Sequence, residues 1–176
     1  MNFWKTFLIT ILVYLGLNTL FVLIGLFVFT PPELATELDD ILLIIALIFA
    51  PIFVFPFEAW ATGISNLITS ADIFVDLFTF FGIIVPPLVA AILAAKLGEE
   101  RDTGFNAWFI TSLIMAVIYA ILLGVGQLSS SVLGITWFEN VSIYGEIGTI
   151  LAIFISGIIN GFFYGCISLI AARKFL

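Results

Sequence analysis

The sequence contains no histidine and a single cysteine, Cys166. Without histidine it lacks the commonest general base and the commonest ligand of transition metals. One cysteine cannot form an intrachain disulfide, a thiolate zinc site or an iron–sulfur cluster. The sequence also has no glycine-rich phosphate loop, nucleophile elbow or cluster of metal ligands. These absences predict a protein that is not an enzyme and has no metal or other cofactor.

Charged residues are scarce, at 10% of the 176 residues, whereas an ordinary soluble domain has about 25%. Hydrophobic residues make up 63% of the chain, and the mean hydropathy is +1.32. A soluble protein of this composition could not cover its surface with polar groups. We therefore expect an integral membrane protein whose main partner is the lipid bilayer.

Basic residues are the rarer of the two charged classes, with five against twelve acidic residues and a net charge of −7. Proteins that bind nucleic acid need a basic surface, so nucleic acid is not an expected partner.

Five long apolar runs follow one another along the chain, and the segments between them are too short for a soluble domain. A helix needs about 20 apolar residues to cross the hydrocarbon core of a membrane. We expect one multi-pass transmembrane domain over residues 1–176, an all-α bundle of five hydrophobic helices. Their expected bounds are Phe7–Phe29, Ile41–Phe57, Ile73–Ala95, Phe105–Gln127 and Ile147–Ala172.

The second run allows another topology, because Pro51 and Pro56 interrupt it and proline breaks a helix. If residues 41–68 form a re-entrant hairpin, the chain enters the membrane and returns to the same side. Only four full crossings then remain.

The basic residues predict the orientation, because lysine and arginine collect in cytoplasmic segments. Five crossings leave Lys5 on the side opposite the other four, whereas the hairpin places all five together. Both topologies put the C-terminus and the 96–104 loop in the cytoplasm and the 128–146 loop outside the cell membrane. The five basic residues are Lys5, Lys96, Arg101, Arg173 and Lys174.

The ends of the runs carry interfacial signals. Residues 31–40 begin with two prolines and an acid, which is typical of a helix start, and we expect a short interfacial helix there. Trp4, Trp60 and Trp108 lie near run ends, where an indole ring favours the lipid headgroups.

Small residues recur every four positions on two of the expected helices. This spacing puts them on one helix face, where a neighbouring backbone can approach closely. We expect this stripe to pack within the bundle, or against another membrane subunit or a second copy. The stripe consists of Gly157, Gly161 and Gly165 on the last run and Ser112, Ala116, Ala120 and Gly124 on the fourth.

Polar residues inside a membrane are costly and therefore informative. Asp72 and Asp76 are four residues apart and share a helix face, and Glu58 closely follows the second run. Asn160 lies within the glycine stripe, where it can bond to another helix or line a solute path. Glu58, Asp72, Asp76 and Asn160 are therefore candidate ion or solute ligands, although solvated helix ends would explain the carboxylates too.

The chain thus has many packing signals and few chemical ones. We expect an accessory or scaffold subunit of a larger membrane complex. The alternative is a small transporter, channel or solute-binding component that uses intramembrane carboxylates. The second function requires the polar candidates to meet in one cavity, whereas the first does not.

Overall fold

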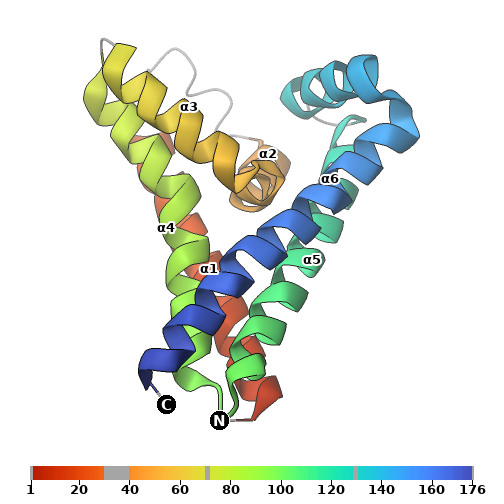
Figure 1. The fold of residues 1–176 in the computed structure, drawn as a ribbon. Coiled ribbons are helices and arrows are strands. Elements are labelled where there is room, and N and C mark those ends of the chain that lie inside the picture. Colours follow the sequence, from red (N-terminus) through yellow and green to blue (C-terminus); the bar gives the residue numbers. More distant parts are fainter. Residues whose placement is uncertain (1, 30–39, 70–71, 129–130, 176) are drawn as a thin grey trace.

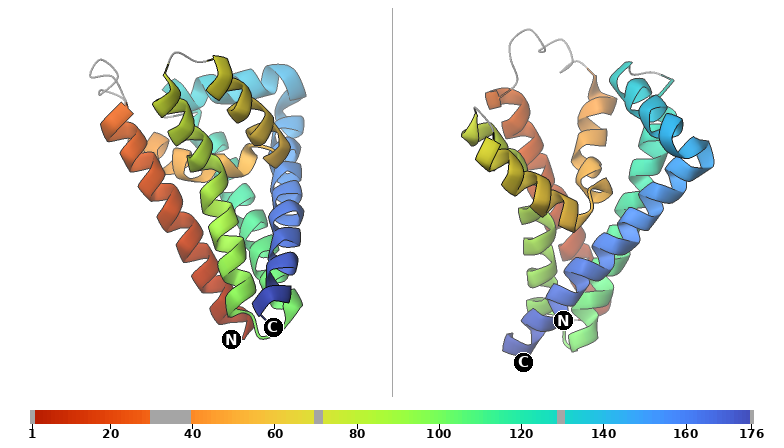
Figure 2. Two further views of the ribbon diagram at one scale, coloured as in Figure 1. Left: turned by 60° about the vertical axis from the view of Figure 1, so that its left-hand side comes forward. Right: turned by 45° about the horizontal axis from the view of Figure 1, so that its top comes forward.

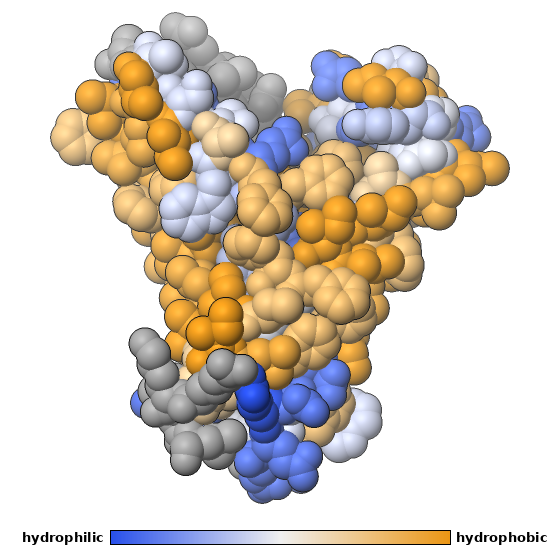
Figure 3. Space-filling view, in the orientation of Figure 1, coloured by the Kyte–Doolittle hydropathy of each residue, from blue (hydrophilic) through white to orange (hydrophobic). Residues whose placement is uncertain are grey.

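The computed structural model describes residues 2–29, 40–69, 72–128 and 131–175, which form helices and no strand (Figure 1). Among these residues, four helical segments are long and apolar enough to cross a membrane, and a fifth qualifies if a bent pair is one span. Figure 3 shows an apolar band on one face, with hydrophilic residues toward both ends. The interfacial helix expected at residues 31–40 falls on positions 31–39, outside the described residues.

Three long helices match the expected runs within a few residues. The first is α1 (Phe3–Ile24), which continues into the π-helical turn η1 (Gly25–Phe29). The others are α4 (Ile73–Leu97), which continues through two prolines, and α5 (Arg101–Gly126). Uninterrupted apolar sequence explains this agreement.

The last helix, α6 (Ser131–Phe175), begins earlier than expected. Gly145 has a φ of 72°, so two helices meet at this glycine. The expected loop at 128–146 is therefore wrong, because the chain is helical from Ser131 to the break. Leu133 and Trp137 explain this helix: they lie one turn apart, and both are buried.

The second apolar run is a bent pair instead of the single helix expected at Ile41–Phe57. It consists of α2 (Ile41–Phe49), the 3-10 turn η3 (Ala50–Phe53) and α3 (Pro56–Thr69). The two arms are bent by 102°. Pro56 has no N–H to continue the hydrogen bonding, but it suits the first position of a new helix. We call residues 41–69 the hairpin.

The long helices form a V in Figure 1, and the right view of Figure 2 shows the same shape. The narrow end holds residues 2–6, 96–104 and 172–175, so both ends of the chain lie there. The wide end holds residues 66–69, 72–76, 124–128 and 131–146 (Figure 1). In the left view of Figure 2, α2 runs across the space between the arms of the V, and α3 runs from the turn to the wide end beside α4. All five basic residues of the sequence therefore belong to the narrow end.

The core is centred on Trp108, which is fully buried. Its ring contacts Tyr14 and Tyr164 edge to face, at centroid distances of 5.3 and 5.8 Å. Its indole N–H donates a hydrogen bond to the Asn160 carbonyl at 3.1 Å. The expected headgroup position is therefore wrong for Trp108, because a backbone acceptor inside the bundle satisfies the indole.

Candidate functional site

The turn of the hairpin is held by two polar side chains of α6. The Ser156 hydroxyl donates to the Ile52 carbonyl at 2.7 Å. The Asn160 amide donates to the carbonyls of Ile52 and Val54 at 2.9 and 3.0 Å. In an uninterrupted helix, the N–H of residue 56 would bond to the Ile52 carbonyl, but Pro56 has no N–H. Ser156 and Asn160 supply the missing donors, and both are buried.

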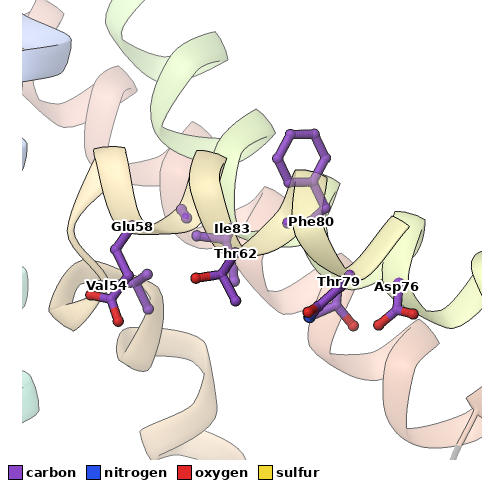
Figure 4. A pocket seen from close by; sticks show the side chains of 10 residues that line it. Val54, Glu58, Thr62, Asp76, Thr79, Phe80 and Ile83 are labelled. Carbon is purple, nitrogen blue, oxygen red and sulfur yellow. The ribbon is translucent and has the colours of Figure 1, made fainter. Parts of the chain in front are cut away.

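A cavity of about 180 Å³ lies between α3 and α4, beside this turn. We call it the acidic cavity. Glu58 and Thr62 of α3 and Thr79 and Asp76 of α4 form one row in Figure 4, with the two carboxylates at opposite ends. The other lining residues are Val54, Ala59, Gly63, Asn66, Phe80 and Ile83. The structure thus brings Glu58 and Asp76 to the same cavity.

The close approach of α3 and α4 is made by Gly63, Trp60 and Phe80. The Phe80 ring lies so near Gly63 that an added Cβ would collide with it. Trp60 contacts the same ring edge to face, with centroids 5.5 Å apart. These apolar contacts join the two helices beside the polar row.

The acidic cavity carries negative charge that the described residues do not neutralise. Asp76 Oδ2 is buried and has no hydrogen-bond partner among them. The basic residues belong to the narrow end, away from the wide end where α3 and α4 meet (Figure 1). Asp76 is half-buried and Glu58 is exposed, so only the buried Asp76 oxygen lacks compensation, and a bound cation would stabilise it.

The other two polar candidates lie outside this cavity. Asp72 is the N-cap of α4, where its carboxylate accepts a hydrogen bond from the Val75 N–H at 3.4 Å. A carboxylate at a helix N-terminus is also favoured by the helix dipole. Asn160 holds the turn of the hairpin, as described above. The structure therefore gives both residues a role in the fold.

The small-residue stripe lies partly between α5 and α6. A Cβ added at Gly157 would be 2.5 Å from the Ala116 Cβ and 3.3 Å from the Ser112 carbonyl oxygen. Added Cβ atoms at Gly161 and Gly165 would each lie 2.7 Å from a phenylalanine ring of α5. The Ser112 hydroxyl also donates to the Gly157 carbonyl at 2.6 Å. These residues allow the two helices to approach closely.

The stripe continues beyond this contact along α5. Ala120 and Gly124 line an apolar groove of about 390 Å³ with Ile150 and Phe154 of α6. A Cβ added at Gly124 would meet no atom within 4 Å. This part of the stripe is therefore not filled by the described part of the chain.

Three polar residues of the acidic cavity were not among the candidates from sequence. They are Thr62, Asn66 and Thr79. The spacing of Glu58, Thr62 and Asn66 at intervals of four does signal one polar helix face. The corresponding signal on α4 is weaker, because Thr79 follows Asp76 by three residues within an apolar run.

Comparisons with family models, curated proteins and solved structures found no match for this chain. Its function is therefore argued from the site, because a fold alone does not determine function.

Proposed function

We propose that this protein is a non-enzymatic, multi-pass membrane protein that binds a small organic cation in the acidic cavity. One observation carries the proposal. Glu58 and Asp76 line the same cavity, and Asp76 Oδ2 is buried there without a hydrogen-bond partner among the described residues. Two carboxylates that line one cavity with no basic residue among the described residues beside them are stabilised by a bound positive charge, so this cavity favours cations over neutral solutes.

The shape of the acidic cavity favours an elongated ammonium compound over a metal ion. A metal ion needs several ligands around one centre. Glu58 and Asp76 instead lie at opposite ends of the polar row (Figure 4), and the described residues contain no group of three histidine, cysteine or acidic side chains that could hold a metal. The cavity volume of about 180 Å³ limits the ligand to a molecule of about six water-sized groups, at roughly 30 Å³ each.

The proposed topology has four crossings and a re-entrant hairpin. It places the narrow end in the cytoplasm and the wide end, with the acidic cavity, outside the cell membrane. All five basic residues then lie inside, as the distribution of lysine and arginine in membrane proteins favours. The 41–69 segment stays in the membrane because α6 satisfies the carbonyls of its turn.

Labelling with a membrane-impermeant thiol reagent tests this topology in a Cys166→Ser background. Asn2→Cys should react only after the cells are permeabilised, and Asp72→Cys should react in intact cells. Both five crossings and the hairpin put position 72 outside, so that variant controls for access. Reaction of Asn2→Cys in intact cells would contradict the four-crossing topology.

Binding of diaminobutane to the protein in lipid nanodiscs tests the cation site. We expect saturable binding by calorimetry, with no binding of butanol. Glu58→Gln and Asp76→Asn should each weaken it by about tenfold to a hundredfold, because each removes a charged partner of the ligand. Asp72→Asn is the matched control, since asparagine also caps a helix and Asp72 does not line the cavity.

Two results would contradict the cation site. One is equal binding of diaminobutane and butanol. The other is an equal loss of affinity in Asp72→Asn and Asp76→Asn, which would indicate a general effect of surface charge.

The groove beside Ala120 and Gly124 supports a second candidate, an accessory subunit that packs against a helix of another membrane subunit. Small residues let helices approach closely in membranes, and this part of the stripe is open. Native mass spectrometry should find a copurifying subunit that Gly124→Leu releases while diaminobutane still binds. A wild-type monomer without a partner would count against this role.

A further inference from the structure

A second cavity, of about 330 Å³, lies between α1, the hairpin and α4. Its walls are largely apolar, and we call it the Asn18 cavity. Its lining residues are Asn18, Phe21, Val22, Gly25, Leu26, Leu47, Ala50, Pro51, Val54, Phe78, Thr79, Gly82 and Ile83.

Asn18 is the deepest polar group of this cavity, with 1% of its surface exposed. Neither its amide nitrogen nor its amide oxygen has a hydrogen-bond partner by distance and angle among the described residues. The Tyr14 hydroxyl, one helical turn away, makes a side-chain hydrogen-bond contact with Asn18 that falls short of this geometry. A primary amide offers two donors and an acceptor, so one hydroxyl could not satisfy it. A buried amide left in this state is costly and indicates a ligand.

The rest of the lining shows how a ligand reaches Asn18. Every other lining residue is partly buried or exposed, so the cavity communicates with the surface of the bundle. Gly25 begins the π-helical turn η1 of α1, and such turns are frequent at functional sites. The opening lies along apolar helices, which favours ligands dissolved in the membrane.

The polar groups of this cavity define the ligand chemistry. No charged side chain of the described residues lines it, so a carboxylate or ammonium group would be buried among them without a counter-charge. A hydroxyl both donates and accepts, which matches the N–H and C=O groups of an amide. Thr79, at the rim, donates its own hydroxyl proton to the Val75 carbonyl and can still accept a hydrogen bond.

We propose that the Asn18 cavity binds the hydroxyl end of an uncharged, membrane-dissolved alcohol. The amide of Asn18 exchanges hydrogen bonds with the hydroxyl group, and the apolar walls enclose the first part of the hydrocarbon chain. The Asn18 cavity shares Val54, Thr79 and Ile83 with the acidic cavity, so the two adjoin. The alcohol site does not depend on the carboxylates, so either site can be disproved without affecting the other.

Photolabelling of the whole protein in nanodiscs tests this proposal. The probes are a dodecanol and a dodecane that carry the same diazirine within the chain, and mass spectrometry locates the label. Dodecanol should label the segments 21–26 and 78–83 about tenfold more than dodecane, because only the alcohol bonds to the amide. Unlabelled dodecanol should compete. Glu58→Gln should leave this labelling unchanged.

Two variants separate the hydrogen bond from the volume of the cavity. Asn18→Leu should reduce dodecanol labelling to the level of dodecane. Val22→Phe keeps the amide but fills the cavity, so it should abolish labelling by both probes. If Asn18→Leu does not fold, Val22→Phe still tests whether the label enters this cavity. Equal labelling of the wild type by the two probes, or wild-type labelling of Val22→Phe, would overturn the proposal.

Discussion

At the narrow end the long helices pack through small residues, whereas at the wide end they separate around a broken segment. A Cβ added at Gly104 of α5 would lie 2.9 Å from the Ala95 backbone of α4 and 2.6 Å from the Ser168 hydroxyl of α6. Such contacts leave little room for a ligand. The wide end contains the hairpin, and its acidic cavity lies between α3 and α4.

Polar side chains are used differently at the two ends. Near the narrow end, Thr10 and Thr111 bond to carbonyls of their own helices, at 2.7 Å each. Around the hairpin, Ser156 and Asn160 bond to carbonyls more than a hundred residues away in sequence. The comparison teaches that tertiary bonds between continuous helices, such as Ser112 to Gly157, add to helix packing, while those to the hairpin satisfy the carbonyls of an irregular backbone.

The largest expected effect comes from removing those tertiary bonds. Asn160→Leu removes the hydrogen bond to the Val54 carbonyl and one of the two to the Ile52 carbonyl, so unfolding should become easier by about 2–5 kcal/mol. Thermal unfolding in detergent measures this. Asn140→Leu is the control, because the Asn140 amide bonds to the Thr136 carbonyl of its own helix. Equal stability of the two variants would show that the hairpin is not held by α6.

Alanine substitutions compare the part of the stripe that packs against α6 with the part that lines the apolar groove. Gly157→Ala puts a methyl group against Ala116 and the Ser112 backbone, which should cost about 1–3 kcal/mol of stability. Gly124→Ala meets no neighbour, and it should stabilise the helix by up to about 1 kcal/mol. Chemical unfolding in mixed micelles compares them, and destabilisation of both alike would contradict the assigned packing.

A smaller effect is expected from the hydroxyl of Ser112. Ser112→Ala removes the 2.6 Å bond to Gly157 but keeps the helix contact, so the loss should be about 1 kcal/mol. Ser142→Ala removes an exposed local bond to Glu139 and should change little. A larger loss in Ser142→Ala would mean that the α5–α6 bond has no special value.

The sequence predicts the continuous helices well, because apolar runs such as Ile73–Ala95 leave no other structure in a membrane. It misses the helix before Gly145, because apolar residues such as Leu133 and Trp137 alternate there with glycine and polar residues and form no long run. It also misplaces Trp108, since an indole at a run end looks the same whether lipid headgroups or the Asn160 carbonyl satisfy it.

The candidate site was only partly predictable for a related reason. Glu58 and Asp76 can be picked out as costly carboxylates, but their shared cavity depends on the 102° bend of the hairpin. That bend depends in turn on bonds from Asn160, far along the chain. Sequence spacing describes faces of single helices and does not show which faces meet.

Carbodiimide modification of Asp76 tests the central claim most directly, because this reagent enters membranes and attacks carboxyl groups. Mass spectrometry would measure the modified fraction of Asp76 in wild-type nanodiscs. We expect diaminobutane to protect Asp76 in a saturable manner, butanol to give no protection, and Glu58→Gln to weaken the protection. Modification of Asp76 to the same extent with and without diaminobutane would contradict a cation site at the wide end.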